Sequence, residues 1–322
     1  MQLFKNLFGR IVMGIVVCMV IVSGTAFAAE QDIAYVKEVL TKNQDLSSGQ
    51  TWMNITLLSP VAKAKVELNS KDIIKPDVFC KGEMITDLSA IWGYKQEIKM
   101  PFYMEKVDDN PVVYWQYDGK WYKIFDIAHT KKMDSLIETA MLSQLSPDSP
   151  IIKSADIVFD NNIQRRVNVV LDGKAIGALL LEITDIIDQQ AKSAPKDDKA
   201  KGAEMEAKEA AKFLYSSLGD MPLELTVDAA TMRITALKAD VSPTLRKVIV
   251  AAVDQYYPVA NADQKEMLDR LLNSCTLTVD AVYTMHNNVA AEMVAVPADV
   301  KAAAQDFLSA AKTAELPTGI VK

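Results

Sequence analysis

Histidine and cysteine are scarce in this chain of 322 residues, which has only two histidines and three cysteines. That scarcity excludes most metal sites built from imidazole and thiolate ligands. The sequence also lacks the G-x-S-x-G, H-E-x-x-H, Walker, G-x-G-x-x-G and C-x-x-C motifs, so it indicates no activated nucleophile, catalytic zinc, phosphate cradle or redox pair. We therefore expect a protein that is not an enzyme, with no catalytic residues, no cofactor and no metal.

Fragments that resemble catalytic or metal-binding motifs have simpler explanations. Ser193 and Lys196 have S-x-x-K spacing, but they lie in a charged segment where no buried pocket can activate a serine. His129 and His286 have no nucleophile beside them. The oxygen-rich stretches 108–110 and 160–162 are typical of turns, because calcium needs more ligands in a defined order.

Basic charge is also in short supply. The chain has 35 Lys and Arg against 42 Asp and Glu, a net charge of −7. Residues 1–28 hold Lys5, Arg10 and no acidic side chain, so the remainder has a net charge of −9. An acidic protein without a basic stripe binds nucleic acid and anionic membrane surfaces poorly, and we expect neither as a partner.

The one long apolar run lies at the N-terminus. Lys5 and Arg10 precede an uncharged apolar stretch over 11–22, and Ala26-Phe27-Ala28 offers the small residues that a signal peptidase reads. The pattern predicts a cleavable signal peptide over 1–28. The mature protein is then periplasmic or secreted in a bacterial envelope, with no stable membrane span.

Two other interpretations of the N-terminus stay open. An uncleaved anchor is one, because residues 11–29 contain no charge, although they barely reach the length of a spanning helix. A lipoprotein anchored through Cys18 is the other, but Val17 stands where lipidation favours Gly, Ala or Ser. In an exported protein, Cys80 and Cys275 either form a disulfide or remain two separate thiols, and spacing alone does not decide.

A helix followed by strands is predicted in the first half. Apolar residues at helical spacing indicate a helix over 30–43, and period-two patterning runs from 50 to 126. Asp118-Gly119 is a strong signal for a two-residue type I′ hairpin turn. The resulting register pairs Tyr117 with Lys120, Trp115 with Tyr122, and Val113 with Ile124. It gathers one apolar face, which we expect to point inward: Val113, Trp115, Tyr117, Tyr122 and Ile124.

Helical spacing predicts a helix over 128–146. A second Asp-Gly pair at 172–173 then predicts a hairpin over 167–178. Two Asp-Gly-Lys hairpins, one in each half of the chain, hint at an internal duplication. The elements expected next are a solvated charged linker near 189–202, a helix over 203–218, strands at 223–227 and 232–239, and a helical segment near 243–273.

The cleanest alternation of the chain lies near the C-terminus. Leu277, Val279, Ala281, Tyr283 and Met285 face one way, with polar residues between them. The sequence then predicts a turn at Asn287-Asn288, a strand over 289–296 and a last helix over 298–313. Runs of strands interrupted by helices predict an α+β fold with a mainly antiparallel sheet, one face solvated and the other covered by helices or left as a cavity.

This order of elements resembles a known superfamily. The segments that carry the resemblance are Tyr-Asp-Gly-Lys-Trp-Tyr at 117–122, Thr-Met-His-Asn-Asn at 284–288 and Val-Pro-Ala-Asp-Val-Lys at 296–301. They are similar to the LolA/LppX-like superfamily of exported bacterial envelope proteins. The resemblance implies a single domain over 29–322, a curved open half-barrel whose concave face is covered by helices, and a cavity that holds acyl chains of lipids or lipoproteins.

The sequence therefore predicts an exported, non-enzymatic binding protein for a lipid or acyl chain. Alternation alone gives the candidate ligand-binding residues, which are Val113, Trp115, Tyr117, Tyr122, Ile124, Val279, Tyr283 and Met285. Ordinary sheet core explains the same alternation. The alternative function is an envelope protein-interaction or sensor module with a filled core, whose partner is another envelope protein.

Overall fold

The computed structural model describes residues 30–44, 46–60, 63–74, 79–87, 97–107, 110–125, 151–191, 209, 212–256 and 261–307. The predicted signal peptide, the predicted helix over 128–146 with His129, and the Ser193–Lys196 pair lie outside the described residues. So do most of the charged linker and the pair Asp108-Asp109. The structure therefore leaves these predictions as they stand.

The strands are β1 (Ser48–Leu58), β2 (Lys63–Ile73), β3 (Phe79–Asp87), β4 (Glu97–Val107), β5 (Asn110–Tyr117), β6 (Lys120–Phe125), β7 (Ile152–Asp160), β8 (Gln164–Leu171), β9 (Met221–Asp228), β10 (Ile234–Asp240), β11 (Thr276–Thr284) and β12 (Gln305–Asp306). The helices are α2 (Glu30–Gln44), α5 (Gly173–Ala191), α7 (Ser242–Tyr256), α8 (Ala262–Asn273), α9 (Ala291–Val294) and α10 (Ala298–Ala303).

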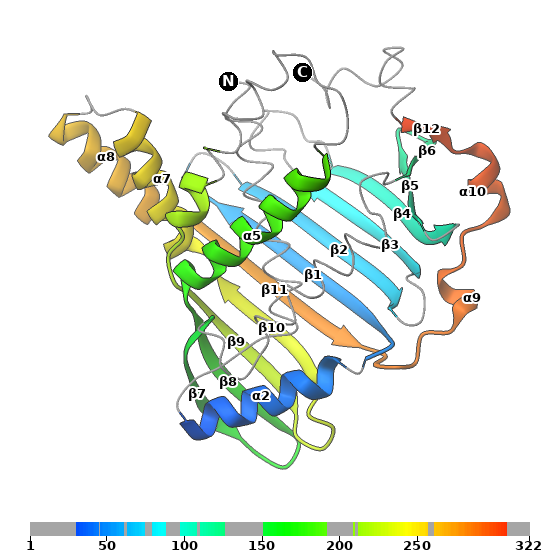
Figure 1. Cartoon of the computed structure of the whole chain (residues 1–322), viewed down its shortest axis with the longest axis horizontal. Coiled ribbons are helices and arrows are strands. Elements are labelled where there is room, and N and C mark those ends of the chain that lie inside the picture. The colour runs from blue at the N-terminus through cyan, green and yellow to red at the C-terminus, as the bar shows by residue number, and fades with distance from the viewer. Residues whose placement is uncertain are drawn as a thin grey trace. The chain divides into compact units, whose positions relative to one another are not determined.

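In the described part of the chain, these strands form one sheet with the hydrogen-bonded order β12-β6-β5-β4-β3-β2-β1-β11-β10-β9-β8-β7 (Figure 1). Strands β2 to β6 pair antiparallel in succession, as do β7 to β10, and β12 joins β6 in parallel. The predicted α+β class with an open, mainly antiparallel sheet is confirmed.

The chain separates into two compact units. Unit 1 comprises Met1–Asp45, Thr56–Ala62 and Met133–Asp280, and unit 2 comprises Leu46–Ile55, Lys63–Lys132 and Ala281–Lys322. The single domain over 29–322 stays a prediction.

Unit 1 has a filled apolar core. Adjacent strands place Val167 opposite Leu225 and Leu225 opposite Leu237, so apolar side chains stack across the sheet. The core members on β8, β9 and β10 are each at most 5% exposed: Val167, Val169, Leu171, Leu223, Leu225, Val227 and Leu237. Helix α2, which lies across β8 to β10 in Figure 1, buries Val36, Val39 and Leu40. The side chains on this face of the sheet are therefore almost completely covered by the protein itself.

A buried asparagine fixes the C-terminal end of α2 to the start of β10. The Asn43 side chain donates to the carbonyl of Met232 at 3.0 Å and accepts from the backbone N–H of Ile234 at 3.1 Å. Because both of its polar ends are bonded, burial of the amide costs little. The helix predicted over 30–43 is confirmed, and this contact holds its end on the sheet.

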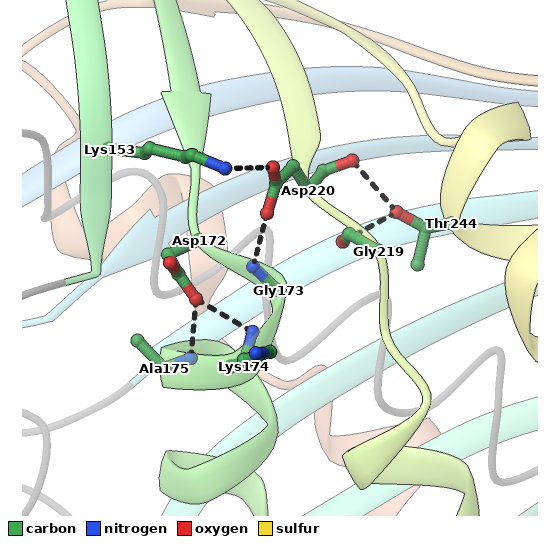
Figure 2. A network of polar contacts seen from close by, with 8 residues as sticks. All are labelled: Lys153, Asp172, Gly173, Lys174, Ala175, Gly219, Asp220 and Thr244. Atoms are coloured by element: carbon green, nitrogen blue, oxygen red, sulfur yellow. Dashed lines mark hydrogen bonds and ion pairs between the residues drawn. The ribbon is translucent and has the colours of Figure 1, made fainter.

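The second Asp-Gly pair begins a helix, so the hairpin predicted over 167–178 is wrong. Asp172 accepts hydrogen bonds from the N–H groups of Lys174 at 2.8 Å and Ala175 at 2.9 Å, as an N-cap residue does (Figure 2). Helix α5 starts at Gly173, whose N–H donates to Asp220 at 3.3 Å. Strand β8 instead pairs with β7, which precedes it across a turn at Asn161-Asn162, and with β9 on its other side. The hint of an internal duplication therefore fails.

Close backbone approach explains the glycine at this helix start. A Cβ at Gly173 would collide with the carbonyl of Gly219, which precedes β9. Thr244 donates to the same carbonyl at 3.0 Å, and Lys153 forms a 2.6 Å ion pair with Asp220 (Figure 2). The starts of α5, β9 and α7 thus meet at one polar cluster within unit 1.

The helical segment predicted near 243–273 is confirmed as α7 and α8. Asn261 and Gln264 form a reciprocal capping box at the start of α8. At its other end, the guanidinium of Arg246 on α7 donates to the carbonyl of Leu272 at 2.9 Å. A cation at a helix C-terminus satisfies free carbonyl groups and favours the helix dipole.

The first Asp-Gly pair makes the predicted hairpin, in unit 2. Asp118 and Gly119 both have positive φ, 50° and 73°, as a type I′ turn requires. The register pairs Tyr117 with Lys120, Trp115 with Tyr122, and Val113 with Ile124, as predicted.

The C-terminal elements differ from prediction. The segment 289–296 forms no strand, because its central residues make the short helix α9. Helix α10 ends at Ala303 rather than continuing to 313, and the chain adds the two-residue strand β12 to the edge of β6. Residues 308–313 lie outside the described residues. Cys80 and Cys275 are free thiols, so the structure contains no disulfide between them.

Replacing Asp172 tests its role as a helix cap. We expect Asp172→Ala to lower the free energy of unfolding by about 1 kcal/mol, because two N–H groups of the first turn lose their acceptor. Asp172→Asn keeps an acceptor oxygen and should cost less. Urea unfolding measures both, and equal losses in the two variants would contradict the assignment.

Candidate functional site: the apolar face of unit 2

The registers of β2 to β6 collect apolar side chains on one face of unit 2. Cross-strand pairing links Leu68 to Met84 and Met84 to Met100, and in the next row Phe102 to Trp115 and Trp115 to Tyr122. Alternate residues of each strand share a face. What we call the apolar face therefore comprises Val66, Leu68, Met84, Ile98, Met100, Phe102, Met104, Val113, Trp115, Tyr117 and Tyr122.

Most of the apolar face is only half-buried. Of its members, Tyr122 is 2% exposed, and the other ten are all of intermediate exposure. In unit 1, by contrast, the corresponding core side chains are almost completely buried. A half-buried set of large apolar side chains still contacts water, so covering it further releases free energy.

A small polar group interrupts one end of the apolar face. Asp72 lies opposite Cys80 in the β2–β3 pair, and the Ser70 hydroxyl donates to the Asp72 carboxyl at 3.0 Å. Burial raises the pKa of Asp72, while hydrogen bonds from Cys80 and Ser70 lower it. Burial, with the nearby Asp72, raises the pKa of the Cys80 thiol. A thiol held protonated is a weak nucleophile, which argues against covalent chemistry at Cys80.

Aromatic rings gather at the other side of the face, near the sheet edge. Trp115 and Tyr122 have ring centroids 6.2 Å apart. Phe307, just after β12, meets Trp115 edge-on at 4.9 Å and Tyr122 edge-on at 6.2 Å. Tyr117 packs against the same cluster. Edge-to-face contacts at these distances are favourable beyond the area that they bury.

The opposite face of the hairpin is also packed, which corrects the prediction that only one face points inward. Val112 is 0% and Tyr114 is 6% exposed. They pack with Val296, Val300 and Ala304 of the C-terminal segment, which contains α9 and α10. The C-terminal segment therefore covers the face of the hairpin that lies opposite the apolar face.

A buried carboxylate ties the C-terminal segment to this opposite face. Glu105 on β4 accepts from the Tyr114 hydroxyl at 3.1 Å and forms a 2.6 Å ion pair with Lys301 of α10. The Glu105 side chain is 9% exposed, so it needs both partners to offset its desolvation. Burial raises the pKa of Tyr114 to about 12, helped by the hydrogen bond to Glu105 and by its charge.

The predicted site residues fall into two groups. Val113, Trp115, Tyr117 and Tyr122 lie on the apolar face, and the backbone of Ile124 pairs with Val113. Val279 on β11 is 1% exposed. Tyr283 ends the same alternation, and Met285 follows β11 with a φ of 53°. A ligand-binding role for these eight residues stays a prediction.

Sequence reasoning missed several members of the face. Strand β4 contributes Ile98, Met100, Phe102 and Met104 through strict alternation with residues such as Glu97 and Lys99. That period-two signal is readable in the sequence. Phe307 had no such signal, because its contacts depend on a two-residue strand that pairs across a long sequence separation.

The described residues contain neither a cluster of metal ligands nor a helix that could span a membrane. No group of three or more His, Cys, Asp or Glu side chains there is arranged to hold a metal ion. Among the same residues, no helix has the length and apolar character needed to cross a membrane.

Tyr114→Phe tests the buried network through its pH dependence. Because the folded-state pKa lies above that of the unfolded chain, stability from this hydroxyl is fully present below about pH 10 and is lost as the pH rises through about 12. We expect the wild type to be more stable than Tyr114→Phe at pH 8, and that advantage to shrink towards pH 12. A pH-independent difference in urea midpoint would contradict the network.

No protein-family model matches the chain, and no curated protein matches it. Among solved structures, the chain is similar to LprF from Mycobacterium bovis, at 10% identity and a TM-score of 0.39, over 81% of this chain and 96% of that one. A likeness at this identity and score assigns no family, so the function has to rest on the side chains of this chain.

Proposed function

We propose that the protein is an exported, non-enzymatic binding protein of the bacterial cell envelope that holds a lipid or acyl chain on the apolar face of unit 2. One observation carries the proposal. Ten large apolar side chains share this face and stay half-buried, whereas unit 1 of the same chain fills its core almost completely. A large apolar surface kept in partial contact with water is typical of a binding site.

The chemistry of the face supports an apolar ligand. Removing apolar surface from water contributes about 25 cal/mol per Å², so covering ~200 Å² gives about 5 kcal/mol. Met84, Met100 and Met104 are flexible and polarizable, and they adapt to ligands of varied shape. Asp72 is the carboxyl group at the edge of this surface, and burial already disfavours its charged form.

Residues from both strands of the hairpin belong to the proposed site. We assign ligand contact to Val113, Trp115, Tyr117, Tyr122 and Ile124, with Tyr283 and Met285 as further candidates. Val279 is the weakest candidate, because it belongs to unit 1 and not to the apolar face of unit 2. The proposed location in the envelope rests on the signal-peptide pattern of residues 1–28.

A second function, a protein-interaction or sensor module, is favoured by a different observation. Helix α8 exposes Met267 at 71% and Leu271 at 41%, on a unit whose core is filled. Exposed apolar side chains on one helix are a feature of protein interfaces. Under this alternative the partner is another envelope protein, and the apolar face binds no small molecule.

Two tryptophans on opposite faces of one hairpin provide a matched test. Trp115 lies on the apolar face, and Trp121 packs with the C-terminal segment on the other. A fatty acid brominated along its chain quenches indole fluorescence at contact distance. We expect it to quench the wild type and Trp121→Phe, but to quench Trp115→Phe much less, because the ligand lies against Trp115.

Secretion level and urea midpoint, measured for both variants, show whether either substitution disturbs folding. Equal residual quenching in Trp115→Phe and Trp121→Phe would place the lipid elsewhere. An absence of quenching in the wild type, together with no uptake of a dansyl-labelled fatty acid, would contradict lipid binding and favour the protein-interaction module.

A further inference from the structure

The aromatic end of the apolar face is occupied by the protein's own chain. After α10, Ala304 takes an extended conformation and Gln305 and Asp306 pair with Tyr122 and Lys123 of β6. Phe307 then turns onto the apolar face, where its ring contacts Trp115 and Tyr122. A side chain from the C-terminal segment thus covers two of the aromatic residues that we assign to the ligand.

The C-terminal segment makes many more contacts with the sheet up to Ala304 than the described residues after Ala304 do. Up to Ala304, Val296 and Val300 are buried in a cluster with Val112 and Tyr114, and Lys301 forms the ion pair with Glu105. Among the described residues beyond Ala304, strand pairing is limited to a two-residue parallel ladder. Parallel pairs are slightly less stable per residue than antiparallel ones, and short ladders open locally at low cost.

We propose that residues 305–307 form a latch: Phe307 occupies the aromatic end of the apolar face until a hydrophobic ligand displaces it, while the segment up to Ala304 stays anchored. This inference rests on the proposed function. The latch shields Trp115 and Tyr122 when the protein is empty. It also sets the affinity, because a ligand must compete with a ring tethered beside its site.

The consequence for affinity follows from competition. If the ligand-competent state is only the fraction of molecules with the latch open, the apparent dissociation constant equals the intrinsic one divided by that fraction. Burial of a phenylalanine ring with two edge-to-face contacts is strong enough to keep the open fraction near ~10% or lower. Removing the ring therefore raises affinity instead of lowering it, which is the opposite of what a residue of the binding surface does.

Phe307→Ala tests the latch, with a dansyl-labelled fatty acid as the probe. We expect the dissociation constant to fall about tenfold in Phe307→Ala and to stay at the wild-type value in Phe307→Tyr, which keeps the ring. Met293→Ala is the matched control, because it removes an apolar side chain that is 40% exposed and lies on α9, before the proposed latch. It should bind as the wild type does.

A disulfide that locks the latch gives the opposite change. Lys123 and Asp306 are registered neighbours on β6 and β12, so Lys123→Cys with Asp306→Cys, in a Cys275→Ser background, can join the two strands. The oxidised variant should bind the probe at least tenfold more weakly than the same variant after reduction.

The possible outcomes separate the latch from the proposed function. Equal affinity in wild type, Phe307→Ala and the locked variant would overturn the latch and leave lipid binding intact. Weaker binding by Phe307→Ala would overturn it too, because Phe307 would then be part of the binding surface. Failure of every variant, including Phe307→Ala, to bind the probe would overturn both.

Discussion

The pairing register of β2 to β6 is the constraint on which the rest of unit 2 depends. Since side chains alternate between the two faces of a strand, a slip of one residue would exchange the apolar and charged sets. The type I′ turn at Asp118-Gly119 fixes the register of its hairpin, and successive antiparallel pairs carry the alternation across to β2. That register places the methionines and the aromatic residues of the apolar face in rows. It also sets the positions of the buried Glu105 and of the rings that Phe307 contacts.

The two units use the same kind of sheet differently. In unit 1, α2 lies across the sheet, and its core residues approach zero exposure. In unit 2, the described helices α9 and α10 belong to the segment that packs on the opposite face, where Val112 and Tyr114 are buried and Glu105 is ion-paired. One chain thus combines a nearly fully buried core in unit 1 with a half-buried apolar face in unit 2.

How far the sequence predicts this structure depends on how local each determinant is. The first hairpin was predicted to the residue, because both turn positions and the alternation lie within a short segment. The second Asp-Gly pair gave a wrong prediction, because an aspartate can cap a helix as well as form a turn. In the structure Asp172 caps α5, and Gly173 lies against Gly219 and donates to Asp220, two residues that are distant in the sequence. The α10–β12 ending was missed because the pairing with β6 and the contacts of Phe307 are long-range. For the site, the alternation of apolar residues predicted which aromatic side chains of the hairpin share a face. It could not predict how deeply they are buried, because their burial depends on packing by distant segments.

The central claim is that a hydrophobic ligand binds the apolar face of unit 2 and not the filled core of unit 1. Methyl NMR of methionine-labelled protein tests it directly, because Met84, Met100 and Met104 belong to that face, whereas Met221 is 3% exposed within unit 1. On addition of a fatty acid, the account predicts shifts of the three unit 2 methyl signals and none for Met221. Unchanged signals from all three, in the presence of demonstrably bound fatty acid, would contradict it.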